Sequence, residues 1–377
     1  MGKLREYMKE QFPLPRRSPD IILLLITLIF VTLGTVMVYG SSAIIAAERF
    51  HDSLHFLKKQ LLFVVVGVSL MIMLARCEYR RLAKLAFPGI VISIVLLILL
   101  FVPPLGVHAN GATRWLNIYV ISFQVSELVK IAMIVYLAHF FAQKASELHG
   151  FTSGILIPLV VAAPILALIV LEPDYGTAAI IMAIVLLMMY LAGSRFVHLL
   201  TLGVLTAVPA IWLILHSANR INRLTAFRDP WADPQRWGFA LIQSLLSFGA
   251  GGTFGVGLGD GMQKLFYLPE PHTDFILAMI GEEMGLLGVL GVIVLFVIFF
   301  VRGFRIAFKA PDSFSMLLAA GLTTLIGLEA FVNIAGVMGL IPLKGLALPF
   351  LSYGGTALIM NMAAVGILLN ISSQEVT

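Results

Sequence analysis

Long apolar runs separated by short polar segments dominate the pattern of hydrophobic and polar positions along the chain. A bilayer core about 30 Å thick requires roughly 20 apolar residues per helix. Runs of about this length, of which the second, fourth and sixth are short, begin near Ile21, Leu61, Leu85, Leu128, Gly154, Thr177, His198, Thr273, Phe314 and Ser352. They predict an all-α polytopic membrane protein with about ten transmembrane helices.

A single membrane domain is expected, because no charged linker or Ser/Pro-rich stretch divides the chain. We assign residues 1–20 to an N-terminal segment, 21–371 to the ten-helix domain and 372–377 to a C-terminal end. A large loop from about 217 to 272 separates the seventh and eighth helices. Its half-apolar piece Phe239–Phe248 has the character of an interfacial helix.

The basic residues of the short loops predict the orientation, since Lys and Arg are in excess on the cytoplasmic side. They gather in three segments, with Lys3, Arg5, Lys9, Arg16, Arg17, Arg76, Arg80, Arg81, Lys84, Arg302, Arg305 and Lys309. An even number of spans puts these segments and the C-terminus in the cytoplasm and the large loop outside. The arginines of the large loop do not oppose this orientation, because long loops translocate largely regardless of charge.

Composition supports residence in the membrane, with 60% hydrophobic and 12% charged residues. A soluble domain has about 25% charged residues. The net charge of +5 comes from basic residues scattered between apolar runs, so nucleic-acid binding is not expected. The single cysteine, Cys77, excludes a disulfide framework and a cysteine-based metal site. The first apolar run is of full length and lacks a small-residue cleavage site, so we interpret it as an anchor.

The first candidate for chemistry is a carboxylate at the start of the eighth span. Two prolines in Leu268–Ile276 bar a helix before Pro271 and favour one immediately after it. Thr273 is predicted to cap that helix, with Asp274 in its first turn. The positive helix end would stabilise a carboxylate there, whereas burial near lipid favours its neutral form. A structural helix-start aspartate and a catalytic one both remain open.

Two further acidic residues, Glu282 and Glu283, lie inside the same predicted helix. They are eight and nine residues from Asp274, which puts Glu282 about 80° round the helix and Glu283 on the opposite face. A carboxylate inside a span costs roughly 2.5–3.5 kcal/mol, so each needs a partner or a wet cavity. For Glu283 we favour a contact between helices.

A second group combines Arg114 with the start of the fourth span. Ser126 is predicted to cap this helix, with Glu127 as its first residue and Lys130 one turn inside. Lys130 could form an i, i+3 ion pair with Glu127. Alternatively, it could point into a cavity and meet an anion, either Asp274 or a substrate phosphate.

Two outer segments complete the candidates. In Glu172–Thr177 one span ends and the next begins, and Asp174 or Thr177 can cap the new helix. In the large loop, Arg220, Arg223 and Arg228 suit capture of a phosphate or carboxylate, or contact with lipid headgroups. The glycines of 249–261 match neither G-x-G-x-x-G nor the Walker spacing, so a nucleotide site is not expected.

Five motifs together resemble the SEDS membrane proteins of bacterial cell-wall synthesis, in order and spacing, over nearly the whole chain. They are Gly111-Ala-Thr-Arg-Trp115, Ser126-Glu127 with Lys130, Pro173-Asp-x-Gly-Thr177, Pro269-x-x-His-Thr-Asp-Phe275 and Leu348-Pro-Phe-Leu-Ser-Tyr-Gly-Gly355. Three more segments resemble the division branch, FtsW, more than the elongation branch, RodA: Arg228–Pro234, Lys264–Pro269 and Leu343–Leu346. Val125 and Glu172 depart from the family pattern, where proline and glutamine are frequent.

This resemblance implies a SEDS fold of ten helices and a glycosyltransferase that polymerises lipid II at the outer face of the cytoplasmic membrane, for septal wall synthesis. The family's catalytic aspartate falls on Asp274. The substrate-binding or supporting residues would be Arg114, Glu127, Lys130, Asp174, Arg223, His272, Thr273 and Ser352. We expect Asp274 to deprotonate the acceptor hydroxyl, and the cations to neutralise the diphosphate or orient Asp274.

The resemblance also implies partners: a class B penicillin-binding protein that supplies the transpeptidase, and other proteins of the division complex. No cofactor is certain, although a divalent cation, Mg²⁺ or Mn²⁺, could aid neutralisation of the diphosphate. Two other functions stay open from the residues. Ten spans with intramembrane Lys130, Glu282 and Glu329 would also suit a lipid II flippase, and a pure scaffold would make Asp274 dispensable.

Overall fold

The computed structural model describes residues 18–374, except 104, 110–111, 119–120, 146, 149, 151, 217, 263–267 and 269–270. The N-terminal basic residues and most of the Lys264–Pro269 motif therefore lie outside the described residues. The long helices are α2 (Ile21–Phe50), α3 (His55–Arg76), α5 (Ala86–Leu99), α6 (Val125–Gln143), α7 (Ile157–Leu171), α8 (Tyr175–Leu191), α9 (Phe196–Leu215), α12 (Ile276–Phe308), α13 (Ser313–Val337) and α14 (Gly355–Ser372).

The predicted multi-pass membrane architecture is confirmed. Among the described residues, seven helices are long and apolar enough to cross a membrane. The other three expected spans correspond to the apolar helices α5, α8 and α9. The second span begins at His55, well before the predicted Leu61, because its first turn is polar and escapes a test based on hydropathy.

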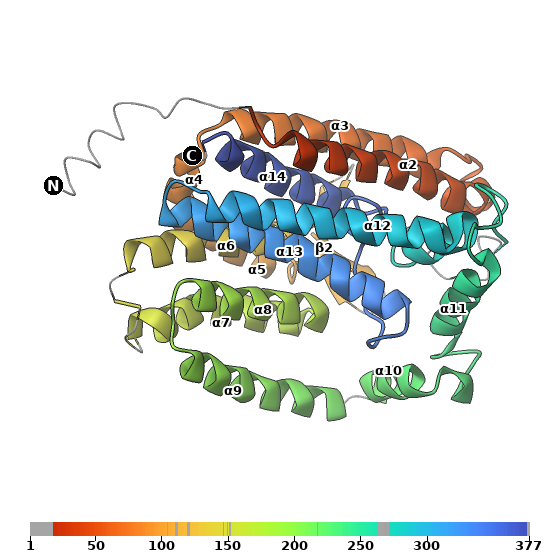
Figure 1. Ribbon diagram of the computed structural model, residues 1–377. Helices are drawn as coiled ribbons and strands as arrows, with labels where there is room; N and C mark the ends of the chain where they lie inside the picture. Colours follow the sequence, from red (N-terminus) through yellow and green to blue (C-terminus); the bar gives the residue numbers. More distant parts are fainter. Residues whose placement is uncertain are drawn as a thin grey trace.

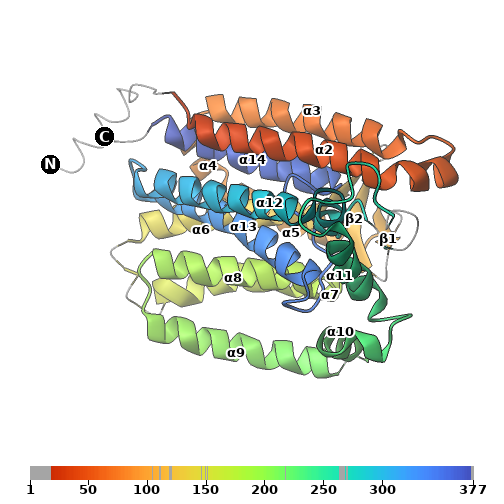
Figure 2. The same cartoon turned by 45° about the vertical axis from the view of Figure 1, so that its right-hand side comes forward.

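The helices run side by side along one direction, so that the molecule has two distinct ends (Figures 1 and 2). The start of α2 and the finish of α14 lie at the same end (Figure 2). The large loop is at the opposite end, where it forms α10 (Ala218–Arg228), the 3-10 helix η2 (Pro230–Ala232) and α11 (Phe239–Gly251). The interfacial helix predicted at Phe239–Phe248 corresponds to α11.

A small antiparallel sheet precedes α6, and the all-α prediction missed it. Its strands β1 (Gly106–Ala109), β2 (Ala112–Ile118) and β3 (Ile121–Gln124) pair in sequence order. The strands are short and interrupted by turns, so their period is weak beside that of the flanking spans. The sheet matters because Arg114 lies on β2.

The interior of the bundle is formed by α6, α13 and α14. In its most apolar stretch, α14 is 78% buried, whereas α3 is only 22% buried and faces outward. Close packing next to α14 requires glycine at Gly34 of α2. A Cβ there would lie 2.7 Å from the Leu351 Cα, much nearer than any carbon contact allows.

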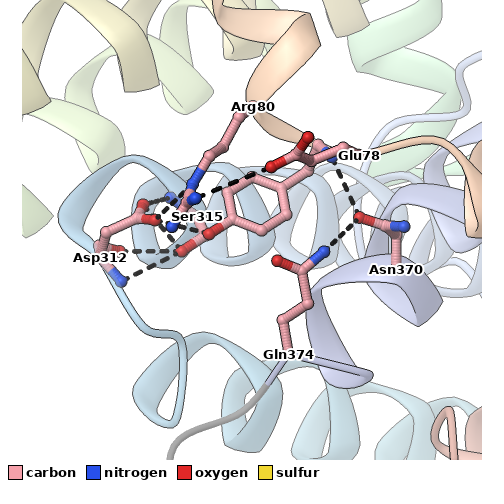
Figure 3. A network of polar contacts seen from close by, with 7 residues as sticks. Glu78, Arg80, Asp312, Ser315, Asn370 and Gln374 are labelled. Carbon is pink, nitrogen blue, oxygen red and sulfur yellow. Dashed lines mark hydrogen bonds and ion pairs between the residues drawn. The ribbon is translucent and has the colours of Figure 1, made fainter. Parts of the chain in front are cut away.

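A polar network joins three helices at the end where α14 finishes (Figure 3). The Tyr79 hydroxyl donates to Asp312 Oδ2 at 2.5 Å. Asp312 also caps α13 by accepting from the Ser315 backbone N at 2.8 Å. The Tyr79 backbone N donates to Asn370 Oδ1 of α14 at 3.1 Å. Because Tyr79 is only 1% exposed, this network fixes the end of α3 against α13 and α14.

Replacing Asp312 with Ala is expected to lower the free energy of unfolding by about 2 kcal/mol. The change removes a helix cap and the partner of a buried hydroxyl. Thermal unfolding of the purified protein in detergent measures the loss. The control is Lys58→Ala, which removes an exposed lysine paired with Asp52 and costs about 0.5 kcal/mol or less. Equal effects of the two variants would contradict the structural role of the network.

Candidate active site

Asp274 lies in a turn, Pro271–Phe275, immediately before α12. The prediction that Thr273 caps the helix is wrong, because α12 begins at Ile276 and its N-cap residue, Phe275, forms no side-chain cap. The turn brings the Asp274 carboxylate against the α13–α14 connection. Its Oδ2 lies 2.8 Å from where a Cβ on Gly345 would stand. Only glycine therefore allows this close approach.

Asn333 fixes the two segments that meet at Asp274. Its Nδ2 donates to the Asp274 backbone carbonyl at 2.9 Å and to the Leu346 carbonyl at 2.6 Å. The side chain is only 1% exposed. One buried amide on α13 thus connects the start of α12 to the α13–α14 connection. In the sequence, Asn333 is distinguished only as a polar position in an apolar helix.

A second polar group surrounds the start of α8. Of the two predicted caps of α8, Asp174 is the one observed, and it accepts from the Thr177 N at 3.3 Å and the Thr177 hydroxyl at 2.8 Å. Arg114 approaches from β2, with its Nε 3.6 Å from Asp174 Oδ2. Its Nη2 donates to the Pro173 carbonyl at 3.1 Å. The strand and the α7–α8 turn are therefore held together by one arginine.

Lys344, which we did not predict as a site residue, connects the two groups. Its Nζ lies 3.9 Å from where a Cβ on Gly176 would stand, and Asp174 Oδ1 lies 3.8 Å from the same point. Burial lowers the pKa of Lys344, and the nearby Asp174 carboxylate opposes this effect. In the sequence, the only indication of Lys344 was its position beside Gly345 in the Leu343–Leu346 motif.

His272 and Thr273 lie in the same turn as Asp274, and Ser352 lies in the α13–α14 connection that contacts this turn. The His272 carbonyl accepts from the Tyr353 N at 2.8 Å, and Ser352 Oγ accepts from the Leu348 N at 2.8 Å. The His272 ring packs against Phe56, with ring centroids 4.5 Å apart. Burial, with a smaller effect of Arg49, lowers the pKa of His272 to about 4. The His272 imidazole is therefore neutral at pH 7. Thr273, the next residue of the turn, is half-buried.

Lys130 is enclosed between two glutamates. Its Nζ donates to Glu127 Oε1 at 2.8 Å and to Glu329 of α13, and the lysine side chain is 2% exposed. The predicted i, i+3 pair with Glu127 is confirmed, and Glu329 is the partner that the sequence did not reveal. The Ser126 cap is wrong, because α6 begins at Val125 with Gln124 as N-cap.

The arginines of the large loop lie on α10. Arg223 is exposed there. Arg220 instead places its guanidinium over the Tyr175 ring, 3.6 Å from the centroid. Because Tyr175 is the first residue of α8, Arg220 is the member of the cluster that reaches the second polar group.

Glu282 and Glu283 have structural contacts. Glu282 Oε1 accepts from the Met262 N at 2.7 Å, which anchors the glycine-rich loop. Glu283 approaches α2, where its carboxylate oxygens lie 4.0 Å from a Cβ placed on Gly40. The predicted helical angles from Asp274 are wrong, because Asp274 lies in the turn before α12 and not on the helix.

Glu172 is buried beside Asp174, and this environment makes its carboxyl group a weak acid. Burial, followed by repulsion from Asp174, raises the pKa of Glu172 to about 8, while Arg114 opposes the shift. The folded protein therefore binds this proton more tightly than the unfolded chain, whose pKa is near 4.5. Ionisation of Glu172 therefore favours the unfolded chain. This destabilisation of the folded protein is absent below pH 4.5 and grows as the pH rises toward 8.

Replacing Glu172 with Gln should remove this pH dependence, because the amide resembles the protonated acid. The melting temperature of Glu172→Gln relative to the wild type should therefore rise between pH 5 and pH 8.5. Thermal unfolding at the two pH values measures the difference. Glu147→Gln, at an exposed glutamate paired with Lys144, is the control and should show no comparable rise. A constant difference for Glu172→Gln would contradict the assignment.

A cation site made by the protein alone is not found in the described part of the chain, where no group of three or more His, Cys, Asp or Glu side chains is placed to hold a metal ion. Asp274 nevertheless fits a different arrangement. Mg²⁺ is often held by one or two carboxylates together with the phosphates of a substrate. A divalent ion at this site would thus need the substrate for most of its ligands.

Comparison with known proteins gives consistent matches over almost the whole chain. The family model FTSW_RODA_SPOVE, described as "Cell cycle protein", matches residues 20–377. "Probable peptidoglycan glycosyltransferase FtsW" of Geobacter sp. (strain M18) is 44% identical over 94% of this chain and 97% of its own length. "Stage V sporulation protein E" of Bacillus subtilis (strain 168) is 41% identical over 95% and 98%.

Two solved structures have the same fold. One belongs to a study of how a peptidoglycan synthase complex coordinates polymerization and crosslinking. It matches with a TM-score of 0.78 and 27% identity, and covers 94% of this chain and 97% of that one. The other is the rod shape determining protein RodA of Thermus thermophilus, with a TM-score of 0.69 and 24% identity over 95% and 98%.

Proposed function

Because the chain belongs to the FtsW, RodA and SpoVE family of cell cycle proteins, we propose that Asp274 is the base with which it polymerises lipid II. The protein is a peptidoglycan glycosyltransferase of the SEDS family, and its close relatives named FtsW indicate a role in division. The observation that carries the proposal for the site is the position of the Asp274 carboxylate. It lies on the turn immediately before α12, against the backbone of Gly345, and Asn333 of α13 holds this turn through the Asp274 backbone carbonyl.

The reaction requires a base for the acceptor hydroxyl and charge stabilisation for the leaving group. Asp274 takes the proton of the acceptor hydroxyl, whose oxygen attacks C1 of the donor sugar. The bond from C1 to the diphosphate oxygen breaks with inversion, and the electron pair leaves with the polyprenyl diphosphate. No nucleotide is needed, since the diphosphate is itself the activated leaving group. General base catalysis contributes roughly 10²–10⁴-fold.

The other predicted site residues support this centre in different ways. Arg114 positions Asp174 and the α7–α8 turn. Lys130 and Glu127 join α6 to α13 through Glu329, so we assign them a supporting role. His272, Thr273 and Ser352 shape the turn and the connection around Asp274, and exposed Arg223 remains a candidate for contact with the substrate. A divalent ion held by Asp274 and the diphosphate would add charge neutralisation.

The proposed setting is the outer face of the cytoplasmic membrane. The excess of Lys and Arg in the short loops supports cytoplasmic termini; in this orientation the Asp274 site would lie with the sheet, α10 and α11 on the outer side. The similarity to a peptidoglycan synthase complex supports a partner that crosslinks the glycan. We propose that this partner is a class B penicillin-binding protein, together with other proteins of the division complex.

A lipid II polymerisation assay with the wild-type protein and its cognate transpeptidase tests the function. Glycan polymer separated by electrophoresis is the expected product. The same preparation in vesicles, with fluorescent lipid II and an external quencher, tests the alternative of a flippase. Movement of label across the membrane without polymer would contradict a glycosyltransferase.

A further inference from the structure

We propose that Lys344 contacts the diphosphate of the lipid-linked sugar donor and stabilises it as it leaves. This inference rests on the proposed function, since it assigns a residue to the leaving group of that reaction. Lys344 lies on the α13–α14 connection, next to the glycine that Asp274 contacts. It adds an electrophilic group to a site in which Asp274 supplies the base.

Lys344 differs from Lys130 and Arg114 in that these two form ion pairs with carboxylates. Lys130 is enclosed by Glu127 and Glu329, which together neutralise it fully. Arg114 forms an ion pair with Asp174 and a hydrogen bond to the Pro173 carbonyl. Within the described part of the chain, Lys344 Nζ has neither a hydrogen bond nor a carboxylate oxygen within 4.0 Å. Its charge is therefore available to an anionic substrate.

The backbone around Lys344 is held firmly relative to Asp274. The Leu346 N donates to the Lys344 carbonyl at 2.8 Å, which closes a tight turn. Asn333 donates to both the Leu346 and Asp274 carbonyls. The ammonium is thus placed by a rigid segment, which is the arrangement that electrostatic stabilisation of a transition state requires.

The Lys344 side chain extends from this turn toward α8. Its Cδ and Nζ lie 3.4 and 3.9 Å from where a Cβ on Gly176 would stand, so the side chain passes within contact distance of this residue. The ammonium therefore reaches the start of α8, while the neighbouring Gly345 contacts Asp274. An inverting transfer needs its base and its leaving group on opposite faces of the sugar. The base and the ammonium therefore have to reach the sugar from different directions, and Asp274 and Lys344 contact different parts of the site.

Burial makes a single positive charge effective at this position. Lys344 is half-buried, and an ammonium that is withdrawn from water interacts more strongly with a diphosphate than an exposed one. When the bond from C1 to oxygen breaks, the diphosphate gains negative charge, which Lys344 stabilises more in the transition state than in the ground state. Lys344 neither gains nor loses a proton in this step.

The direct test is binding of undecaprenyl diphosphate, the released product, to the full-length protein purified with its cognate transpeptidase. Lys344→Gln should bind this probe roughly 10- to 100-fold more weakly than wild type, because a hydrogen bond to a charged group is lost. Lys344→Arg should retain the affinity within a few-fold. Lys58→Gln, which removes an exposed lysine paired with Asp52, is the matched control and should bind as wild type does.

Steady-state kinetics give a second measurement. Loss of transition-state stabilisation should lower kcat of Lys344→Gln more than it raises KM. Lys344→Met, which keeps the apolar stem, replaces Lys344→Gln if the glutamine variant fails to fold or to retain the transpeptidase. Wild-type affinity for undecaprenyl diphosphate in a folded neutral variant would overturn the inference. The proposed function fails separately, if the wild type makes no polymer from lipid II.

Discussion

Asp274→Ala and Asp274→Asn are expected to abolish measurable glycan polymerisation while the protein still folds and retains its transpeptidase. Each variant removes the base, and general base catalysis is worth roughly 10²–10⁴-fold. Folding should persist because Asn333 holds this segment through the Asp274 backbone carbonyl, which both substitutions retain. The N-cap residue of α12 is Phe275, which both variants leave in place. Electrophoresis of polymer made from lipid II measures the loss.

Asp260→Asn is the matched control, because Asp260 is an exposed aspartate of the large loop that precedes Asp274. This variant should polymerise lipid II at the wild-type rate. Polymer made by Asp274→Ala in complex with its transpeptidase would show that another group is the base. The scaffold function would instead be favoured if Asp274→Ala and Asp274→Asn both supported normal division in cells and the purified wild type made no polymer.

The transmembrane helices could be predicted from sequence because their signal is strong and local. A run of about 20 apolar residues has few other structures open to it. The first residues of the helices were harder to predict, because they depend on the conformation of the preceding turn and on capping contacts. At α12 and α6 the predicted caps Thr273 and Ser126 were each wrong by two positions. At α8 the prediction of Asp174 was right, because Pro173 and Gly176 restrict the turn.

The site was predictable only in part, because its residues come from helices that are distant in sequence. Motifs marked Asp274 and Asp174, and their capping and charge could be argued locally. Asn333 and Glu329 could not be found in this way, since each is a single polar residue in an apolar helix whose partner lies elsewhere. Lys344 required knowledge that the α13–α14 connection returns to both Asp274 and the start of α8.

Lys130→Met is expected to have the largest effect on stability, lowering the free energy of unfolding by about 3–5 kcal/mol. The lysine and its two glutamate partners are almost fully buried, with side chains 2%, 9% and 6% exposed. Removing the cation leaves two carboxylates close together without a counter-charge, and this is far costlier than the loss of an exposed pair. Thermal unfolding and the yield of folded protein from membranes measure the effect.

Lys144→Met provides a matched control at the C-cap of the same helix, α6. Lys144 also forms an i, i+3 pair, with Glu147, but their side chains are 43% and 52% exposed. Its loss should cost about 0.5 kcal/mol or less. A triple variant that combines Lys130→Met with Glu127→Gln and Glu329→Gln should recover much of the lost stability, because the two carboxylates are then neutral.

These variants also distinguish a structural Lys130 from one that contacts substrate. If Lys130 acts through its glutamates, the stabilised triple variant should bind undecaprenyl diphosphate almost as tightly as wild type. If Lys130→Met instead folds normally and binds undecaprenyl diphosphate weakly, Lys130 contacts the substrate. The proposal that Lys344 alone stabilises the leaving diphosphate would then be wrong. A buried lysine between two carboxylates has no charge left for a third anion, so we expect the first result.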